Sequence, residues 1–260
     1  MTGSDPAGRT GRLPVGYAHR GFAPDGAENT MGAFQAAIGL GFDHLETDVR
    51  VTSDGVAVLF HDPVLDRLTN HTGPLRRLSW RQLSQARVLG GEPIPRLTDL
   101  LASFGDAFVN LDLKVDEAIG PTLDAIRQTG AAGRVRLATF SHSRLLTARG
   151  AAGPTVASAL SPAEVAALLA GRTGRLPLGH PGGLAAQVPA QLGRFGLTER
   201  LLRQAHRHGI EVHAWTVNDS AQLRWLLELG VDAIITDRLD LLRTVLIERR
   251  QWPGGPARPG

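Results

Sequence analysis

The sequence contains no cysteine, which excludes disulfide bonds, thiolate zinc sites and cysteine nucleophiles. It has no apolar run near the ~20 residues that cross a bilayer, and residues 1–6 lack the apolar segment of a signal peptide. We therefore expect a cytoplasmic, enzyme-sized domain without stable membrane insertion. The sequence carries no indication of an oligomeric state.

Lysine is nearly absent, because 27 of the 28 basic residues are arginine and only Lys114 is lysine. A Schiff-base enzyme would have to use Lys114, and a P-loop is excluded because Val115 follows it in place of Ser or Thr. The Gly-x-Ser-x-Gly and His-Glu-x-x-His motifs of hydrolases are absent too. Scattered arginines, a net charge of +3 and a single tyrosine do not indicate a nucleic-acid groove.

Short β-type runs alternate with helical patterns between residues 13 and 250, which we expect to form one catalytic domain between flexible tails at 1–12 and 251–260. This alternation over 260 residues favours an α/β fold, the (β/α)8 TIM barrel. The alternative is an open doubly wound sheet, but its glycine-rich dinucleotide motif is missing. The expected strands are Val15–His19, Asp43–Val49, Ala107–Lys114, Val135–Phe140, Thr155–Leu160, Ala185–Pro189, Glu211–Val217 and Ala233–Thr236. Expected helices include Met31–Leu40, Gly120–Gln128, Pro162–Ala170, Thr198–His208 and Ser220–Leu229.

A β-hairpin is expected to interrupt the alternation after the second strand. Asp54-Gly55 is a two-residue turn signal, and such a turn makes residues face each other when their numbers sum to 109. His61 is then expected opposite Asp48 and on the same strand face as Glu46. Residues 63–92 are expected to follow as a small insertion with helical pieces.

Three carboxylates lie near expected strand ends, where the active sites of (β/α)8 barrels gather. Glu46 and Asp48 are two residues apart on one strand, so their side chains point the same way with Cα atoms roughly 7 Å apart. Two carboxylates on one face repel each other unless a cation or a proton lies between them. With Asp112 they offer three hard oxygen ligands, which suit Mg²⁺ or Ca²⁺. The alternative is that all three form salt bridges to neighbouring arginines.

Two histidines, His19 and His61, are expected at the same end of the barrel, with Arg20 beside the first. A histidine pair can supply a base and an acid near neutral pH. The adjacent arginine suits an oxyanion, above all a phosphate. A lone histidine is more often structural, but two that converge on carboxylates favour catalysis.

Other polar residues leave more than one interpretation open. Glu28 is a candidate additional site carboxylate, whereas Asn29 or Thr30 is expected to cap the following helix. Lys114 suits either a salt bridge at the mouth of the barrel or a phosphate contact. Trp215 suits either core packing or a wall of the substrate pocket, and Asp237 is expected to cap the last helix or to orient a neighbouring side chain.

These residues together resemble the glycerophosphodiester phosphodiesterase family, over residues 15 to 240. Each motif alone is weak, but ten in the same order are specific. The matching segments are Ala18-His19-Arg20-Gly21, Glu28-Asn29-Thr30, Glu46-Thr47-Asp48-Val49, Thr52-Ser53-Asp54-Gly55, Phe60-His61-Asp62-Pro63, Asp66-Arg67-Leu68-Thr69-Asn70, Ile94-Pro95-Arg96-Leu97, Leu113-Lys114, Trp215-Thr216-Val217-Asn218 and Thr236-Asp237.

The resemblance implies a TIM barrel and a phosphodiesterase that uses a divalent cation to hydrolyse glycerophosphodiesters to sn-glycerol 3-phosphate and an alcohol. It implies that His19 and His61 are the acid–base pair and that Arg20 binds phosphate. The implied metal ligands are Glu46, Asp48 and Asp112, and the implied phosphate and glycerol contacts are Lys114 and Trp215.

Two residues depart from the family pattern, which usually has Glu at the position of Asp112 and Pro at that of Ala27. An aspartate is one methylene shorter, so Asp112 is expected to bind the metal through water, to bind it more weakly, or to leave room for a larger ion. An aspartate third ligand also resembles the sphingomyelinase D and lysophospholipase D group, so a lipid phosphodiester is the alternative substrate. A barrel that binds a phosphate ligand without turnover is the non-enzymatic alternative, but binding alone needs no histidine pair.

Overall fold

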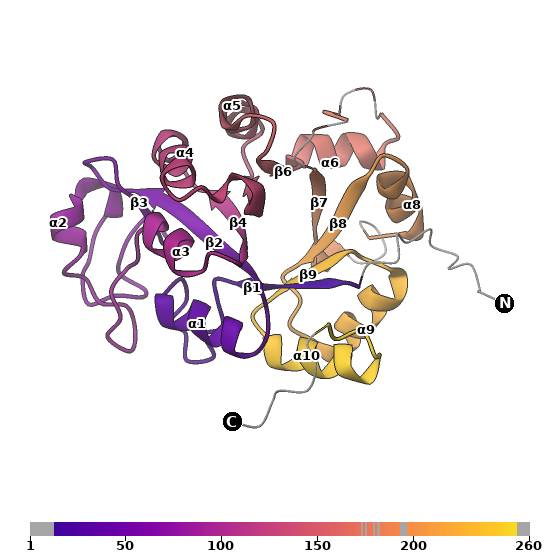
Figure 1. The fold of residues 1–260 in the computed structure, drawn as a ribbon, viewed down its shortest axis with the longest axis horizontal. Helices are drawn as coiled ribbons and strands as arrows, with labels where there is room; N and C mark the ends of the chain where they lie inside the picture. Colours follow the sequence, from indigo (N-terminus) through magenta and orange to yellow (C-terminus); the bar gives the residue numbers. More distant parts are fainter. Residues whose placement is uncertain are drawn as a thin grey trace.

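The computed structural model describes residues 13–253 except 173, 175, 179, 181, 182 and 193–196. Eight parallel strands close into a barrel (Figure 1), because the first strand pairs with both the second and the last. The TIM barrel is therefore confirmed, and the open sheet is excluded. The tails expected at 1–12 and 251–260 lie outside the described residues, apart from 251–253. The barrel strands are β1 (Val15–His19), β2 (His44–Val51), β4 (Phe108–Leu113), β5 (Val135–Ala138), β6 (Ala157–Ala159), β7 (Leu184–Pro189), β8 (Ile210–Trp215) and β9 (Ala233–Thr236).

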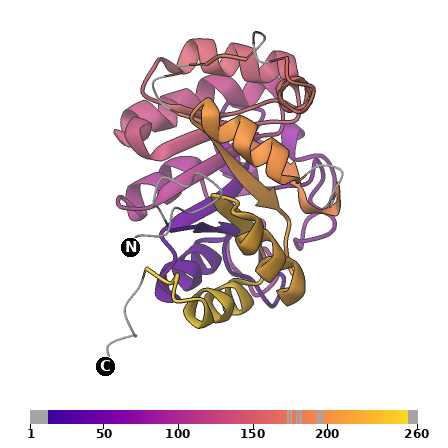
Figure 2. The same cartoon turned by 90° about the vertical axis from the view of Figure 1, so that its right-hand side faces the viewer.

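Helices cover the outside of the barrel, as the view in Figure 2 shows for those at its top and bottom. The expected helices are present with ends shifted by one residue at most, and further helices precede β4 and follow β5 and β9. None of the helices in the described part of the chain has the length and apolar character of a membrane span. The helices around the barrel are α1 (Met31–Gly39), α3 (Leu97–Ser103), α4 (Ile119–Gln128), α5 (His142–Ala152), α6 (Pro162–Leu169), α8 (Glu199–Arg207), α9 (Ser220–Leu229) and α10 (Leu239–Glu248).

The alternation of side chains along β2 separates the core from the site. Leu45 and Val49 are fully buried in the main hydrophobic cluster, between the strands and the surrounding helices. Glu46 and Asp48 point to the opposite face, since successive side chains of a strand alternate. The barrel therefore presents polar groups inward and is stabilised mainly by the apolar layer outside its strands.

The hairpin between β2 and β3 (Ala57–Leu59) differs from the prediction by one residue. Val51 pairs with Ala57, so facing residue numbers sum to 108 rather than 109. The turn is longer than expected, because the Thr52 amide donates to the Val56 carbonyl at 3.0 Å. This closes a three-residue loop that needs glycine in the left-handed region, and Gly55 has φ +83°.

The new register corrects the expected position of His61. The Phe60 amide, not that of His61, donates to the Asp48 carbonyl at 3.0 Å. A slip of one residue would point His61 away from the site if the strand continued. The strand ends at Leu59, however, and the turn that follows returns the His61 side chain to the pocket.

The insertion at residues 63–92 has a hydrophobic cluster of its own, which we call the insertion core. It contains short helical pieces, as expected: the 3-10 turn η1 (Leu75–Arg77) and α2 (Trp80–Leu83). Its buried side chains come from the insertion, from the segments on either side of it and, at Ala27, from the loop between β1 and α1, and they form a cluster separate from the main core. The insertion core consists of Ala27, Val58, Phe60, Leu65, Leu68, Leu75, Leu83, Ala86, Val88 and Ile94.

Candidate active site

A pocket of about 510 Å³ opens where the barrel strands end. His19 and Trp215 are the last residues of β1 and β8, and the other strands contribute residues at or near their carboxyl ends. The pocket therefore brings together all but one of the candidate residues; only Glu28 is not among its lining. The candidates that line it are His19, Arg20, Glu46, Asp48, His61, Asp112, Lys114 and Trp215.

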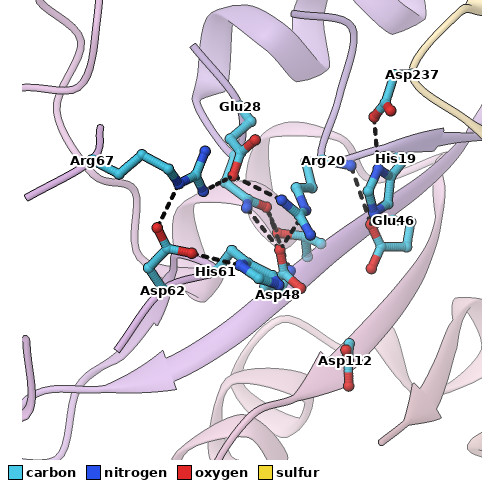
Figure 3. A network of polar contacts seen from close by, with 12 residues as sticks. His19, Arg20, Glu28, Glu46, Asp48, His61, Asp62, Arg67, Asp112 and Asp237 are labelled. Carbon is cyan, nitrogen blue, oxygen red and sulfur yellow. Dashed lines mark hydrogen bonds and ion pairs between the residues drawn. The ribbon is translucent and has the colours of Figure 1, made fainter. Parts of the chain in front are cut away.

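His19 is held between two carboxylates. Its Nδ1 lies 2.6 Å from Asp237 Oδ1, and its Nε2 lies 3.9 Å from Glu46 Oε2 (Figure 3). Burial lowers the pKa of His19, but the Asp237 hydrogen bond and the charge of Glu46 outweigh it, so the pKa is raised. Burial raises the pKa of Asp237, but His19 and Asn218 lower it overall, so the carboxylate is ionised and Nδ1 donates the hydrogen bond.

Asp237 thus orients His19 rather than capping the last helix. Of the two expected roles, capping is excluded because Arg238 is the N-cap of α10 and no side chain caps that end. Asn218 Nδ2 donates to Asp237 Oδ2 at 2.7 Å and so fixes the aspartate. His19 Nε2, which faces the pocket, is left to accept or donate a proton.

Replacing Asp237 with asparagine is expected to lower the pKa of His19, because it removes the largest effect that opposes burial. The measurement is an NMR titration of the His19 ring in the presence of EDTA. Asp240→Asn is the matched control. Asp240 pairs with Arg238 and not with His19, so this substitution removes one nearby negative charge without removing a His19 hydrogen bond. An equal fall in both variants would mean that net charge, not the hydrogen bond, sets the His19 pKa.

His61 is oriented in the same way by its neighbour in sequence. Its Nδ1 lies 2.7 Å from Asp62 Oδ1. Arg67 donates a hydrogen bond to Asp62 and lowers the pKa of that carboxyl to about 2. Asp62 is therefore ionised and accepts a hydrogen bond from Nδ1–H of His61. The pocket therefore contains two imidazoles, each fixed through Nδ1 by its own aspartate.

Arg20 reaches the site through an unusual backbone conformation. Its φ is +56°, and its amide donates to the Glu46 carbonyl at 3.0 Å and to Glu46 Oε2 at 3.1 Å. Its guanidinium donates to Glu28 Oε1 at 2.9 Å, and Nε lies 3.0 Å from Asp48 Oδ2 without hydrogen-bond geometry. Burial lowers the pKa of Arg20, but Asp48 and Glu28 raise it overall, so the group stays cationic.

Asp48 is the most strongly compensated carboxylate of the site. It is 1% exposed and contacts Lys114 Nζ at 2.7 Å, Asn29 Nδ2 at 3.0 Å and Arg20. Burial raises the pKa of Asp48, but Lys114 and Arg20 outweigh it, and the pKa is lowered. Asp48 is therefore an anion at neutral pH.

Glu46 and Asp112 also have cations or hydrogen-bond donors beside them, but these do not outweigh the effect of burial. Burial, followed by repulsion from Asp48, raises the pKa of Glu46 to about 7. Burial likewise raises the pKa of Asp112, although Lys114 Nζ lies 2.5 Å from its Oδ2. Asp112 Oδ1 is buried and has no hydrogen-bond partner. The pocket lining thus contains three carboxylates, Glu46, Asp48 and Asp112, and two permanent cations, Arg20 and Lys114.

The carboxylate oxygens of Glu46, Asp48 and Asp112 are ligands of the type that a divalent cation prefers, although these side chains are not arranged around a common point. Within the described residues, no three His, Asp or Glu side chains are placed to hold an ion together. Lys114 Nζ instead lies between Asp48 and Asp112. The unpartnered Asp112 oxygen and the raised pKa of Glu46 nevertheless fit a hard cation bound by oxygen ligands.

The opposite wall of the pocket is apolar, which the sequence did not indicate beyond Trp215. Val165 and Leu169 lie one turn apart on α6 and line it together with Leu160. Trp215 meets Phe140 edge to face with ring centroids 5.4 Å apart, so Trp215 belongs to the pocket wall.

Asp62 and Arg67 were not among the predicted site residues. The expected helix cap at Asn29 or Thr30 is confirmed at Thr30, whereas the buried Asn29 side chain donates to Asp48. Asp62 contacts His61, and Arg67 contacts both Asp62 and Glu28. The signal for Asp62 was its place beside His61 in sequence; Arg67 had none beyond its motif.

Comparisons with known proteins agree on one family. Residues 19–241 match the model of the glycerophosphoryl diester phosphodiesterase family. Over 250 residues, the chain is 42% identical to the probable glycerophosphodiester phosphodiesterase 2 of Mycobacterium tuberculosis, covering 92% of this chain and 93% of that protein. The crystal structure of a glycerophosphodiester phosphodiesterase from Agrobacterium tumefaciens is similar, with a TM-score of 0.74, 27% identity, and coverage of 90% of this chain and 99% of that one. An Oleispira antarctica phosphodiesterase, in complex with the product sn-glycerol-3-phosphate, has a TM-score of 0.74 and 23% identity, covering 90% of this chain and 97% of its own.

Proposed function

The chain belongs to the glycerophosphoryl diester phosphodiesterase family, and from this premise we propose that it releases sn-glycerol 3-phosphate and an alcohol by His/His acid–base catalysis with a divalent cation. One observation carries the proposal: two imidazoles, each oriented by an aspartate, face one pocket that also holds Arg20 and Lys114. The Oleispira antarctica structure contains the product that we propose here.

The residues of the chain divide the reaction between them. Arg20 lines the pocket, where its guanidinium binds the phosphodiester and neutralises charge that develops on the phosphate oxygens. One histidine accepts the proton of the nucleophile, and the other donates a proton to the leaving alcohol. Attack by the glycerol 2-hydroxyl expels the alcohol and gives a cyclic phosphate, which water then opens to sn-glycerol 3-phosphate. Direct attack by water gives no cyclic phosphate, so an assay for cyclic product separates these routes.

Glu46, Asp48 and Asp112 are the residues that would hold Mg²⁺ or Ca²⁺. Such a cation supplies positive charge that stabilises the phosphate oxygens in the transition state. Lys114 pairs with Asp112 in this structure. Once a divalent cation neutralises Asp112, the Lys114 ammonium is available to contact the phosphate. The cytoplasmic location expected from the sequence stays a prediction.

The test is hydrolysis of glycerophosphocholine by the purified protein with EDTA, with Mg²⁺ and with Ca²⁺. We expect release of sn-glycerol 3-phosphate with a metal and a loss of at least ~100-fold in EDTA, since the cation stabilises charge worth several kcal/mol. Equal rates with and without EDTA would contradict the metal. Release of choline phosphate instead would contradict the proposed bond cleavage.

The apolar wall favours a second candidate substrate, a lysophospholipid. Leu160, Val165 and Leu169 offer no hydrogen bonds to a small polar alcohol, whereas they suit an acyl chain. The same assay with lysophosphatidylcholine decides between the two. A higher kcat/KM for the lipid, lost selectively in Val165→Asp, would identify the lipid as the substrate.

A further inference from the structure

Arg67 connects the insertion to both sides of the site. Its Nε donates to Asp62 Oδ2 at 2.6 Å, and its terminal nitrogen donates to Glu28 Oε1 at 2.8 Å. Figure 3 shows the Arg67 guanidinium between the carboxylates of Asp62 and Glu28. Arg67 does not belong to the described lining of the pocket, whereas His61 and Arg20 do.

Each of the two carboxylates holds a residue that faces the substrate. Asp62 accepts from His61 at 2.7 Å, and Glu28 Oε1 accepts from Arg20 at 2.9 Å as well as from Arg67. Asp62 is the acceptor that fixes the His61 tautomer with the proton on Nδ1. Displacing either carboxylate therefore moves a group that would contact the phosphodiester.

We propose that Arg67 is a positioning residue, which holds His61 through Asp62 and Arg20 through Glu28 and so aligns the acid–base group with the phosphate ligand. A planar guanidinium is required, because two donors must point at two carboxylates in a fixed geometry, which a single ammonium does not reproduce. The effect on catalysis rests on the proposed function, whereas the effect on the His61 ring does not.

The experiment compares Arg67→Met in the wild-type and His61→Ala backgrounds. We expect kcat/KM for glycerophosphocholine to fall about 10- to 100-fold in the wild-type background, the usual effect of removing a residue that orients a functional group. The loss should be clearly smaller once His61 is absent, because only the Arg20 contact is then affected. An equal loss in both backgrounds would overturn the proposal.

Arg96→Met is the matched control, and Arg67→Lys tests the geometry. Arg96 also donates two hydrogen bonds to a carboxylate, that of Asp99, and its side chain is 45% exposed against 48% for Arg67. Arg96 lies outside the pocket lining, so its variant should keep wild-type kcat/KM. We expect Arg67→Lys to recover only part of the lost activity, and full recovery would contradict the need for the guanidinium.

NMR of the His61 ring nitrogens provides a measurement that needs no substrate. We expect wild type to show the proton on Nδ1 and Arg67→Met to show a mixture of tautomers. Unchanged His61 signals in Arg67→Met would overturn the positioning role, whatever the assay shows. If wild type hydrolyses no phosphodiester but the signals change as expected, the proposed function fails and the positioning of His61 stands.

Discussion

Replacing His61 with alanine is expected to lower kcat at least ~100-fold, in line with the usual contribution of an acid–base group. The Asp62 carboxylate accepts a hydrogen bond from Nδ1–H, so Nε2 is the ring nitrogen available for proton transfer. Alanine removes that nitrogen, and no other described histidine except His19 lines the pocket. The measurement is steady-state hydrolysis of glycerophosphocholine at saturating substrate.

His71→Ala is the control for this variant. His71 also belongs to the segment after β3 and hydrogen bonds to its sequence neighbour, Asn70, but it lies outside the pocket lining. It should keep kcat within about twofold of wild type, because it takes no part in proton transfer. Near-normal turnover by His61→Ala would remove His61 from the mechanism.

Replacing Asp48 with alanine is expected to reduce the free energy of unfolding by about 3–5 kcal/mol, the usual cost of removing one partner of a buried ion pair. The Asp48 side chain is 2% exposed and lies between the cations of Arg20 and Lys114, which are themselves largely buried. Its removal leaves two positive charges with less compensation and takes the acceptor from Asn29. Urea denaturation in EDTA measures the effect without contribution from a bound metal.

Asp99→Ala gives the surface comparison. Asp99 pairs with Arg96, and both side chains are more than a third exposed. Exposed pairs contribute about 0–1 kcal/mol, so this variant should lose far less stability. Equal losses in the two variants would show that the buried network around Asp48 contributes no more than a surface pair.

The sequence predicted the barrel because its signals are local. Alternating strands and helices at ordinary lengths leave few topologies, and the closure of β1 onto β9 follows from the strand count. The hairpin register was wrong because Asp54-Gly55 occurs in both two-residue and three-residue loops. The difference depends on which amide reaches the Val56 carbonyl: the Thr52 amide does, whereas the Ser53 amide donates to the Leu78 carbonyl of the insertion at 2.9 Å.

The pocket-lining candidates were found because the carboxyl ends of parallel strands meet in space. The same argument does not find residues that lie outside the pocket and hydrogen-bond to the residues that line it. Asn29 and Thr30 both suit a helix cap, and only the burial of Asn29 beside Asp48 distinguishes them. The partners of Arg67 include Glu28, which is 39 residues away and on another loop, and no sequence period connects them.

The insertion core has a consequence for how long the site stays assembled. Because it is separate from the main cluster, residues 63–92 form a unit whose local unfolding costs less than unfolding of the barrel. Each such opening takes Arg67 away from Glu28, which is on another loop, while the eight strands stay paired. We therefore expect the lifetime of the aligned site to depend on the insertion core, so that a protein with a very stable barrel can still have a short-lived active arrangement.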